Sequence, residues 1–305
     1  MGKMASELGT RSENYVSTTV APGKSLTLMS VQSDCSERRR LQMSQLGLDW
    51  KETSDEIVKF IGETVGSAGA KGSVIGLSGG IDSSVVATLL VRALGKDHVL
   101  GLLMPTHFTP KEDIDDAKWL AKFLQIRSQI VDIHPVVEAF ASALGTSEKT
   151  QTTRIPLANI RSRTRMILLY YFANLNNYLV AGTGDRSEDL IGYFTKYGDG
   201  GVDFLPISHL YKTEVRKLGE HLGLPPRMVL KPSSPQLYPG HKATDEIPLD
   251  YDQLDPVLKM LFDDKSPSER VADKTNVSIE VVQDALRRFH TSAHKRSYPY
   301  MVRPW

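Results

Sequence analysis

The sequence predicts an α/β protein with a doubly wound, mostly parallel sheet, helices on both faces of the sheet and a helical C-terminal part. Short apolar runs alternate with longer segments of helical periodicity, a pattern typical of parallel strands joined by helices. Two of these runs lead directly into glycine-rich turns, at 79–80 and 182–184. Because ligands bind at the carboxyl ends of strands in such sheets, these turns are the first candidates for a site.

The predicted elements follow one another from about Asp49. Trp50, Ile57, Phe60 and Ile61 recur at helical spacing and indicate an amphipathic first helix. The predicted strands cover 73–78, 99–104, 129–133 and 178–181. The predicted helices cover 83–94, 109–124, 156–177, 211–222, 251–262, 266–274 and 278–289. The second of these helices opens with Thr109-Pro-Lys-Glu112, which combines a capping box with proline at the first helical position.

Residues 1–45 differ from the rest, because they are rich in Ser, Thr and charge and show no persistent period. We interpret them as a flexible N-terminal extension before a single folded domain over 46–305. A transit peptide is the weaker alternative. The basic cluster Arg38–Arg40 favours it, but the acidic residues argue against it. These are Glu7, Glu13, Asp34 and Glu37.

Composition narrows the class of protein. The 305 residues are 40% hydrophobic and 24% charged, which is enough to bury a full core. The net charge is only +1, whereas proteins that bind nucleic acid usually carry a basic excess. No apolar run approaches the roughly 18 residues that span a bilayer, and the start lacks the apolar core of a secretory signal. We therefore expect a cytoplasmic protein that binds neither nucleic acid nor membrane.

The loop Ser78-Gly-Gly-Ile-Asp-Ser83 lies between a predicted strand and a predicted helix. Two glycines let the backbone approach a ligand closely, and the helix N-terminus attracts an anion. Asp82 would repel a phosphate unless Mg²⁺ lay between the two. The loop is neither a Walker loop nor a dinucleotide fingerprint. The alternative is a tight strand-to-helix turn in which Asp82 caps the helix. The loop resembles the Ser-Gly-Gly-x-Asp-Ser signature of the PP-loop ATP pyrophosphatases, which cleave ATP between the α and β phosphates.

A second dense stretch runs from Gly182-Thr-Gly-Asp-Arg-Ser-Glu188 through 192–203 to Lys212. Glu188 can supply a second oxygen ligand to Mg²⁺, and lysines can neutralise phosphate. A surface loop with solvated charges is the alternative interpretation. Together with the phosphate loop, this stretch resembles the ammonia-dependent NAD synthetase family over roughly residues 46–300. The resemblance implies an adenine nucleotide alpha hydrolase-like fold.

The resemblance also implies a set of site residues. The ATP-binding loop would comprise Gly76, Leu77, Ser78, Gly79, Gly80, Ile81, Asp82 and Ser83, with further ATP contacts at Thr183, Lys212 and Ser234. The magnesium ligands would be Asp82 and Glu188. The deamido-NAD contacts would be Arg163, Lys196, Asp203, His294 and Lys295, and the catalytic residues Asp82, Lys196 and Lys212. Arg163 is preferred over Arg161 and Arg165 by register with the family pattern Ala-Arg-x-Arg-Met, in which Ser162 replaces the alanine. The match loosens between Tyr238 and Asp250.

The expected reaction follows from this resemblance. The nicotinate carboxylate of deamido-NAD would attack the α-phosphate of MgATP, and ammonia would then displace AMP to form NAD. Asp199 and Asp203 are both candidates to handle the ammonium proton, and the glycine-rich stretch 192–201 is a candidate lid that excludes water. The family resemblance implies a homodimer, and the aromatic ending 298–305 suggests packing against the body or a second subunit. Another PP-loop enzyme that amidates a different carboxylate, or a non-catalytic nucleotide sensor, is the alternative.

The only cysteine, Cys35, bears on the source of nitrogen. It excludes an internal disulfide and any multi-cysteine metal site. Enzymes that take ammonia from glutamine usually carry a second domain with a cysteine nucleophile, and the predicted synthetase leaves no room for one. We therefore expect the chain alone to use ammonium and not glutamine, although a separate glutaminase in the cell could supply ammonia.

Overall fold

The computed structural model describes residues 48–146, 151–234, 236–247 and 249–302. The expectation for the extension 1–45, and with it Cys35, lies outside the described residues. The described part forms one compact unit from Asp49 onward. None of its helices is long and apolar enough to cross a membrane.

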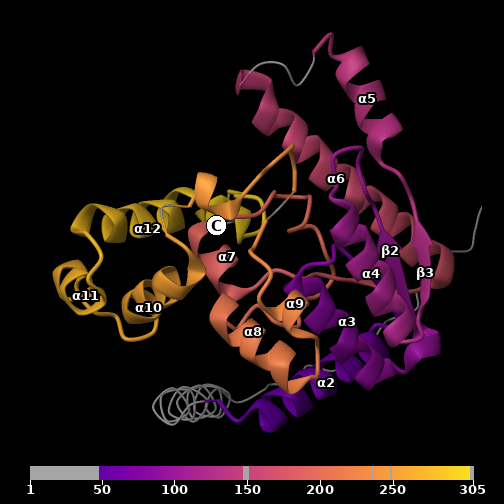
Figure 1. Ribbon diagram of the computed structural model, residues 1–305, viewed down its shortest axis with the longest axis horizontal. Coiled ribbons are helices and arrows are strands. Elements are labelled where there is room, and N and C mark those ends of the chain that lie inside the picture. Colours follow the sequence, from indigo (N-terminus) through magenta and orange to yellow (C-terminus); the bar gives the residue numbers. More distant parts are fainter. Residues whose placement is uncertain (1–47, 147–150, 235, 248, 303–305) are drawn as a thin grey trace, which may run out of the picture. The chain divides into compact units, whose positions relative to one another are not determined.

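A parallel sheet of four strands organises this unit (Figure 1). The strands are β1 (Ser73–Gly76), β2 (Val99–Leu103), β3 (Arg127–Ile130) and β4 (Leu179–Ala181), in the spatial order β3-β2-β1-β4. The chain winds outward from β1 through β2 to β3 and then returns to place β4 on the other side of β1. This order puts the topological switch between β1 and β4, so the two glycine-rich turns that follow these strands meet at one edge.

Helices cover both faces of the sheet, as predicted. Val74 and Ile75 point to opposite faces, and both are 0% exposed. On the side of Val74 the strands share a core with α5 (His134–Ala143) and α6 (Gln151–Asn176). On the other side they pack against α3 (Ile81–Leu94) and α4 (Lys111–Phe123), and α2 (Trp50–Ser67) packs outside α3.

The third strand and the helix after it differ from the sequence prediction. The predicted strand 129–133 begins earlier, because the residue paired with Leu100 of β2 is Arg127. The chain still follows β2 beyond β3, since Ile133 N–H donates to Pro105 O. Helix α5 was not predicted. Of its ten residues it buries Val137 and Ala141.

The C-terminal part is helical, as predicted. The predicted helices are α8 (Lys212–His221), α10 (Tyr251–Phe262), α11 (Ser268–Thr275) and α12 (Ile279–Thr291). Two short helices were not predicted, α7 (Arg186–Ile191) and α9 (Pro226–Val229). Leu190 and Ile191 of α7 and Tyr211 before α8 belong to one buried cluster with residues of α10, α11 and α12. The turn after β4 therefore lies between the sheet and the C-terminal helices, and both fix its position.

Candidate active site

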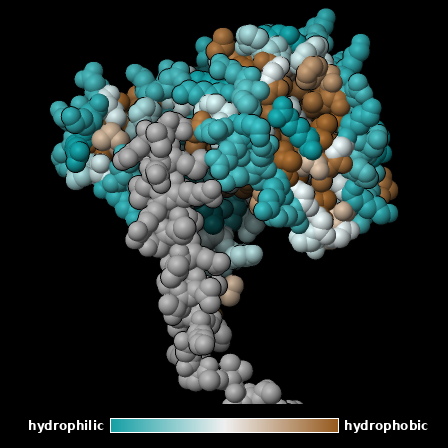
Figure 2. All heavy atoms as spheres, turned by 90° about the horizontal axis from the view of Figure 1, so that it is seen from below, coloured by the Kyte–Doolittle hydropathy of each residue, from teal (hydrophilic) through white to brown (hydrophobic). Residues whose placement is uncertain are grey.

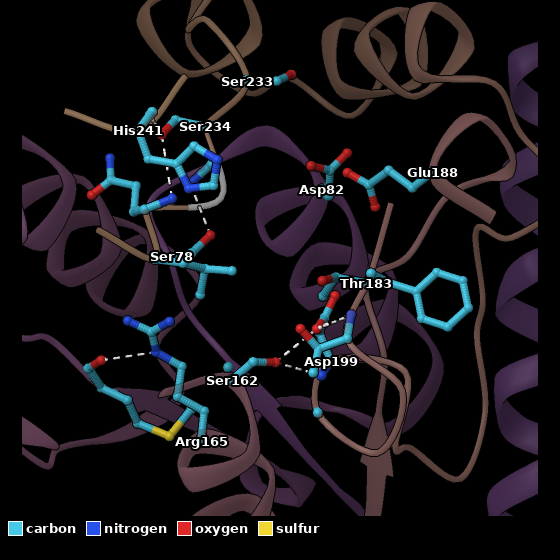
Figure 3. Close-up of a pocket in the computed structure, with 18 of the residues that line it drawn as sticks. Ser78, Asp82, Ser162, Arg165, Thr183, Glu188, Asp199, Ser233, Ser234 and His241 are labelled. Atoms are coloured by element: carbon cyan, nitrogen blue, oxygen red, sulfur yellow. Dashed lines mark hydrogen bonds between the residues drawn. The ribbon is translucent and has the colours of Figure 1, made fainter. Parts of the chain in front are cut away.

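A cavity of about 480 Å³ opens at the carboxyl ends of β1, β2 and β4. Its walls come from the loop after β1, the turn after β4, one side of α6 and the segments 192–199 and 231–246. Figure 3 shows Ser78, Asp82, Thr183, Glu188 and Ser234 around this space. The structure thus brings together the ATP and metal residues expected from both turns. All the loop residues Gly76 to Ser83 except Gly79 and Ser83 line the cavity.

The geometry of the phosphate loop explains its glycines. Gly79 has a φ of +78°, and a Cβ atom there would lie 2.3 Å from Asp113 O. Gly80 precedes α3 without a side-chain cap, which leaves the first N–H groups of the helix available to a ligand. Ser83 Oγ donates to Gly80 O (3.1 Å) and accepts from Ser78 N (3.3 Å), which holds the loop closed. Asp82 is therefore not the capping residue of the alternative interpretation.

A brace of Lys231, Arg227, Asp113 and Asp116 supports this loop, and two of its members, Lys231 and Asp113, also line the cavity. No local sequence pattern pointed to it. Lys231 Nζ lies 2.7 Å from Asp113 Oδ1 and 2.6 Å from Asp116 Oδ2, and it donates to Gly79 O (3.3 Å). Arg227 Nε donates to Asp116 Oδ1 (3.0 Å). Helix α4 and the segment after α9 are thus tied to the phosphate loop by charge-assisted hydrogen bonds.

Lys212 is the centre of the cavity's charge cluster. Its side chain is 0% exposed, and its Nζ lies 2.8 Å from Asp82 Oδ2. The same nitrogen lies 2.9 Å from Asp185 Oδ2 and 2.9 Å from Glu188 Oε1. Asp185, which sequence reasoning did not single out, also caps α7 by accepting from Glu188 N (2.9 Å). Both proposed metal ligands therefore share one buried ammonium group.

The cluster contains more negative than positive charge. Burial raises the pKa of Asp185 to about 6 and that of Glu188 to about 8, although Lys212 opposes both shifts. Burial would lower the pKa of Lys212, but Asp185, Asp82 and Glu188 outweigh it and raise that pKa well above its usual value. Asp82 Oδ1 is buried and has no hydrogen-bond partner among the described residues. A cation beside Asp82 and Glu188 would satisfy this oxygen and offset the excess charge.

The chemistry of these donors fits Mg²⁺. Magnesium favours oxygen ligands and usually binds through one or two carboxylates together with water and substrate phosphates. Among the described residues, no group of three His, Cys, Asp or Glu side chains is arranged as a metal site. The two carboxylates therefore suit an ion whose remaining ligands come from a bound nucleotide.

The C-terminal helices determine where Lys212 lies. Ser187 Oγ donates to Asp255 Oδ1 (2.6 Å) and accepts from Lys212 N (3.0 Å). Asp255 Oδ2 accepts from Thr213 N (2.8 Å). Asp255 belongs to α10 and is 3% exposed, so it holds the first turns of α7 and α8 together from a third helix. In the sequence, Asp255 could have been noticed as a carboxylate at an otherwise apolar position of a predicted helix.

The expected deamido-NAD residues divide between two places. Lys295 lines the cavity, where its Nζ donates to Gly192 O (2.8 Å) and Phe194 O (2.7 Å). Arg163, Lys196, Asp203 and His294 are not among the residues that line it. Arg163 Nη2 donates to Lys196 O (3.3 Å), and Lys196 Nζ donates to His294 O, so these three form a connected group.

The cavity includes Asp199 and Arg165, each of which was one of several alternatives in the sequence. Of the two candidate carboxylates, Asp199 lines the cavity, whereas Asp203 accepts from Tyr170 OH (3.0 Å) and Val180 N (2.7 Å) at β4. Arg165, which register made second to Arg163, also lines the cavity (Figure 3). Its one hydrogen bond to a described residue runs from Nε to Met104 O (3.2 Å), and burial lowers its pKa to about 10. Its charge is therefore kept at neutral pH and its other N–H groups are available to a ligand.

Comparison with known proteins identifies the relatives of this fold and site. The sequence profile of the NAD synthase family matches residues 53–299. The NH(3)-dependent NAD(+) synthetase of Hyperthermus butylicus is 49% identical over 255 residues, which is 83% of this chain and 91% of that protein.

Solved structures agree with this match. The NH3-dependent NAD synthetase of Campylobacter jejuni superposes with a TM-score of 0.70 at 33% identity, over 84% of this chain and all of that one. The NMN synthetase of Francisella tularensis gives a TM-score of 0.73 at 32% identity, over 84% and 99% of the two chains. The order of the two glycine-rich motifs, the fold that joins them and these matches together place the chain in the NAD synthase family.

Proposed function

We propose that the protein is an ammonia-dependent NAD synthetase, which adenylates the nicotinate carboxylate of deamido-NAD with ATP and amidates it with ammonia. The observation that carries this proposal is the cluster of Asp82, Asp185 and Glu188 around Lys212, beside the phosphate loop in one cavity. A nucleotide sensor has no need of two aligned metal carboxylates next to a phosphate loop, so this cluster favours catalysis.

The phosphate loop would hold the β and γ phosphates of ATP, which leave as pyrophosphate. Its N–H groups and the start of α3 point positive charge at that position. Asp82 and Glu188 would hold Mg²⁺, which would draw electrons from the phosphate oxygens and weaken the bond between the α and β phosphates. Thr183 and Ser234 line the same cavity and would contact the nucleotide.

Lys212 would act in two ways. Its hydrogen bonds keep Asp82 and Glu188 side by side, so it orients the metal ligands before ATP binds. With Asp82 and Glu188 engaged as metal ligands, the ammonium group of Lys212 would stabilise the negative charge that builds up at the α-phosphate. A preorganised contact of this kind is commonly worth about 3–4 kcal/mol. Arg165 has free N–H groups on the cavity wall and would offer a second positive charge to the anionic substrates.

Asp199 would handle the nucleophile. A carboxylate in the cavity attracts ammonium and can take up its proton as nitrogen attacks the carbonyl carbon of the adenylate. The new C–N bond replaces the C–O bond to AMP, and AMP leaves with that oxygen. Asp203 is less suited, because both of its oxygens already accept hydrogen bonds, one from Tyr170 of α6 and one from Val180 of β4.

The position of Arg163 supports a dimer in which a second copy of the chain completes the deamido-NAD site. Arg163 shares one face of α6 with Ile167, Tyr171 and Leu175, since all four are spaced four residues apart. These three apolar side chains are 55%, 60% and 67% exposed. On the face of the molecule seen in Figure 2, apolar residues gather toward the right-hand side. Large exposed apolar patches on soluble proteins mark interaction sites. A second copy packed on this stripe would bring its own surface to Arg163 and would enclose the connected group of Arg163, Lys196 and His294.

A smaller carboxylate substrate is the second candidate. One structural relative is named for NMN synthesis, and the corresponding substrate would be nicotinate mononucleotide, which lacks the AMP half of deamido-NAD. The assay therefore supplies purified protein with MgATP, ammonium and either nicotinate compound. We expect NAD, AMP and pyrophosphate in equal amounts from deamido-NAD. A clear preference for nicotinate mononucleotide would replace the proposed substrate, and no AMP from either compound would contradict the proposed activity.

The nitrogen source needs a separate test. We expect ammonium to support the reaction and glutamine freed of ammonium not to, with the Cys35→Ser variant unchanged. Because ammonia is a minor species at neutral pH, the rate at limiting ammonium should rise with pH until groups of the enzyme titrate. Glutamate released in step with NAD would contradict this expectation.

A further inference from the structure

Ser162 is a buried hydroxyl with an unusual number of contacts to one acidic residue. It lies on α6 and is 4% exposed. Its Oγ donates to Asp199 Oδ1 (2.7 Å) and also accepts from Asp199 N (2.9 Å). One side chain thus holds both the carboxylate and the backbone of Asp199.

The neighbouring contacts leave one carboxylate oxygen of Asp199 available. Oδ1 accepts a second hydrogen bond from Thr195 N (2.9 Å), whereas no hydrogen bond or ion pair to Oδ2 is found among the described residues. Lys295 of the cavity wall interacts electrostatically with Asp199, but its Nζ donates to the backbone carbonyls of Gly192 and Phe194. The hydrogen bonds from Ser162 Oγ and Thr195 N to Oδ1 therefore fix the rotation of the Asp199 carboxyl group and leave Oδ2 free for a cation.

The turn that carries Asp199 is built around the serine hydroxyl. A Cβ atom on Gly198 would lie 2.2 Å from Ser162 Oγ, so the backbone passes directly over the hydroxyl. One turn earlier on α6, Asn159 Oδ1 accepts from Thr195 Oγ1 (2.8 Å) and anchors the start of the same turn. Asn159 would hold the turn even without Ser162, so loss of the serine hydroxyl should release the Asp199 carboxyl group more than the whole turn.

We infer that Ser162 is a positioning residue that aims Asp199 Oδ2 at the incoming ammonium. The inference rests on the proposed function, because Asp199 has this task only if ammonia is the second substrate. It predicts a defect confined to the ammonia step. Adenylation would take place at the phosphate loop and the Lys212 cluster, whereas the side-chain hydrogen bonds of Ser162 to described residues both go to Asp199.

The test compares four variants of the full chain: Ser162→Ala, Asp199→Asn, the double variant and Thr164→Val. Thr164 is the matched control, because it lies on the same helix, is 3% exposed and carries a hydroxyl with no hydrogen-bond partner among the described residues. Two rates are measured. Ammonium-dependent NAD formation gives kcat/KM for ammonium, and pyrophosphate formed without ammonium reports adenylation.

We expect Ser162→Ala to lower kcat/KM for ammonium about tenfold, the order of magnitude of one hydrogen bond to a charged group. Pyrophosphate formation and KM for ATP should stay at the wild-type values, and Thr164→Val should match the wild type in both assays. Asp199→Asn should lower the ammonium step further, and adding Ser162→Ala to it should cost nothing more, because the serine acts through the carboxylate.

Three results would overturn the inference. They are an unchanged kcat/KM for ammonium in Ser162→Ala, an equal loss in pyrophosphate formation, and a full additional loss in the double variant. The second and third would assign Ser162 a merely structural role. A wild-type chain that forms AMP and pyrophosphate but no amide with ammonium would instead contradict the proposed function itself, and with it the task of Asp199.

Discussion

Replacing Lys212 with methionine tests the charge cluster most directly. Methionine keeps much of the length and apolar volume of the lysine stem, so the change removes mainly the charge. Lys212 and Asp185 are both 0% exposed, and three carboxylates would lose their shared cation. Removing one partner of a buried ion pair typically costs about 3–5 kcal/mol of the free energy of unfolding. That is a large share of a total stability of about 5–15 kcal/mol.

The expected readouts are thermal unfolding and turnover. A loss of this size should lower Tm by roughly 6–20 °C, at about 2–4 °C per kcal/mol for a domain of this size. Turnover should fall by about 10²–10³-fold, the usual effect of removing one transition-state contact. Mg²⁺ should raise Tm more in Lys212→Met than in the wild type, because a bound cation stabilises the folded state and replaces the missing charge.

Lys217→Met on the same helix is the matched control, because Lys217 is exposed and lies outside the cluster. It should change Tm and turnover little. The reasoning would be refuted by a Lys212→Met variant that keeps the wild-type Tm without Mg²⁺, since that would mean the carboxylates do not need the lysine.

The remaining predictions concern the metal, the brace, the dimer and the N-terminus. Glu188→Ala should nearly abolish turnover while circular dichroism shows the fold intact, and near-normal activity at ordinary Mg²⁺ would contradict a two-carboxylate site. Burial would raise the pKa of Asp116, but hydrogen bonds from Lys231 and Arg227 lower it, so its stabilising effect is present above an unfolded pKa of about 3.9 and is lost as pH falls through the lower folded value. Asp116→Asn should therefore cost about 1–3 kcal/mol in urea unfolding at pH 7, and the difference from the wild type should disappear in acid. Light scattering should find twice the chain mass of 33.9 kDa for the wild type and the single mass for Tyr171→Asp, and a fully active wild-type monomer would refute the dimer. Deleting residues 1–45 should leave Tm and activity nearly unchanged, and a large loss of either would show that this segment belongs to the fold or the site.

Most elements of the fold could be predicted, because the pattern that reveals a strand or an amphipathic helix lies within a short stretch of sequence. Strands β1, β2 and β4 are short apolar runs between turn residues, and the amphipathic helices show their buried faces as periodicity. The bounds of β3 were not predicted correctly because all four of its residues are exposed, so the strand carries no apolar pattern.

The local features of the site could also be predicted from sequence, whereas its long-range contacts could not. The phosphate loop could be recognised from sequence, since its glycines, serines and Asp82 are contiguous and do their work through local backbone geometry. Three long-range contacts could not be recognised, because no local pattern records which distant side chain meets which. They are the contact of both proposed metal ligands with Lys212, the bonds by which Asp255 of α10 fixes the start of α8, and the bond from Lys231 to Gly79.

The choice between Asp199 and Asp203, and between Arg163 and Arg165, shows what tertiary structure decided. Composition and spacing treat the members of each pair alike. The two aspartates differ only in whether β4 or the cavity receives the carboxylate, and the two arginines lie two residues apart on one helix and so face different ways. The sequence by itself determined the chemistry available to this protein, and the packing of α6 against the sheet and the 192–203 segment decided which of those groups faces the cavity.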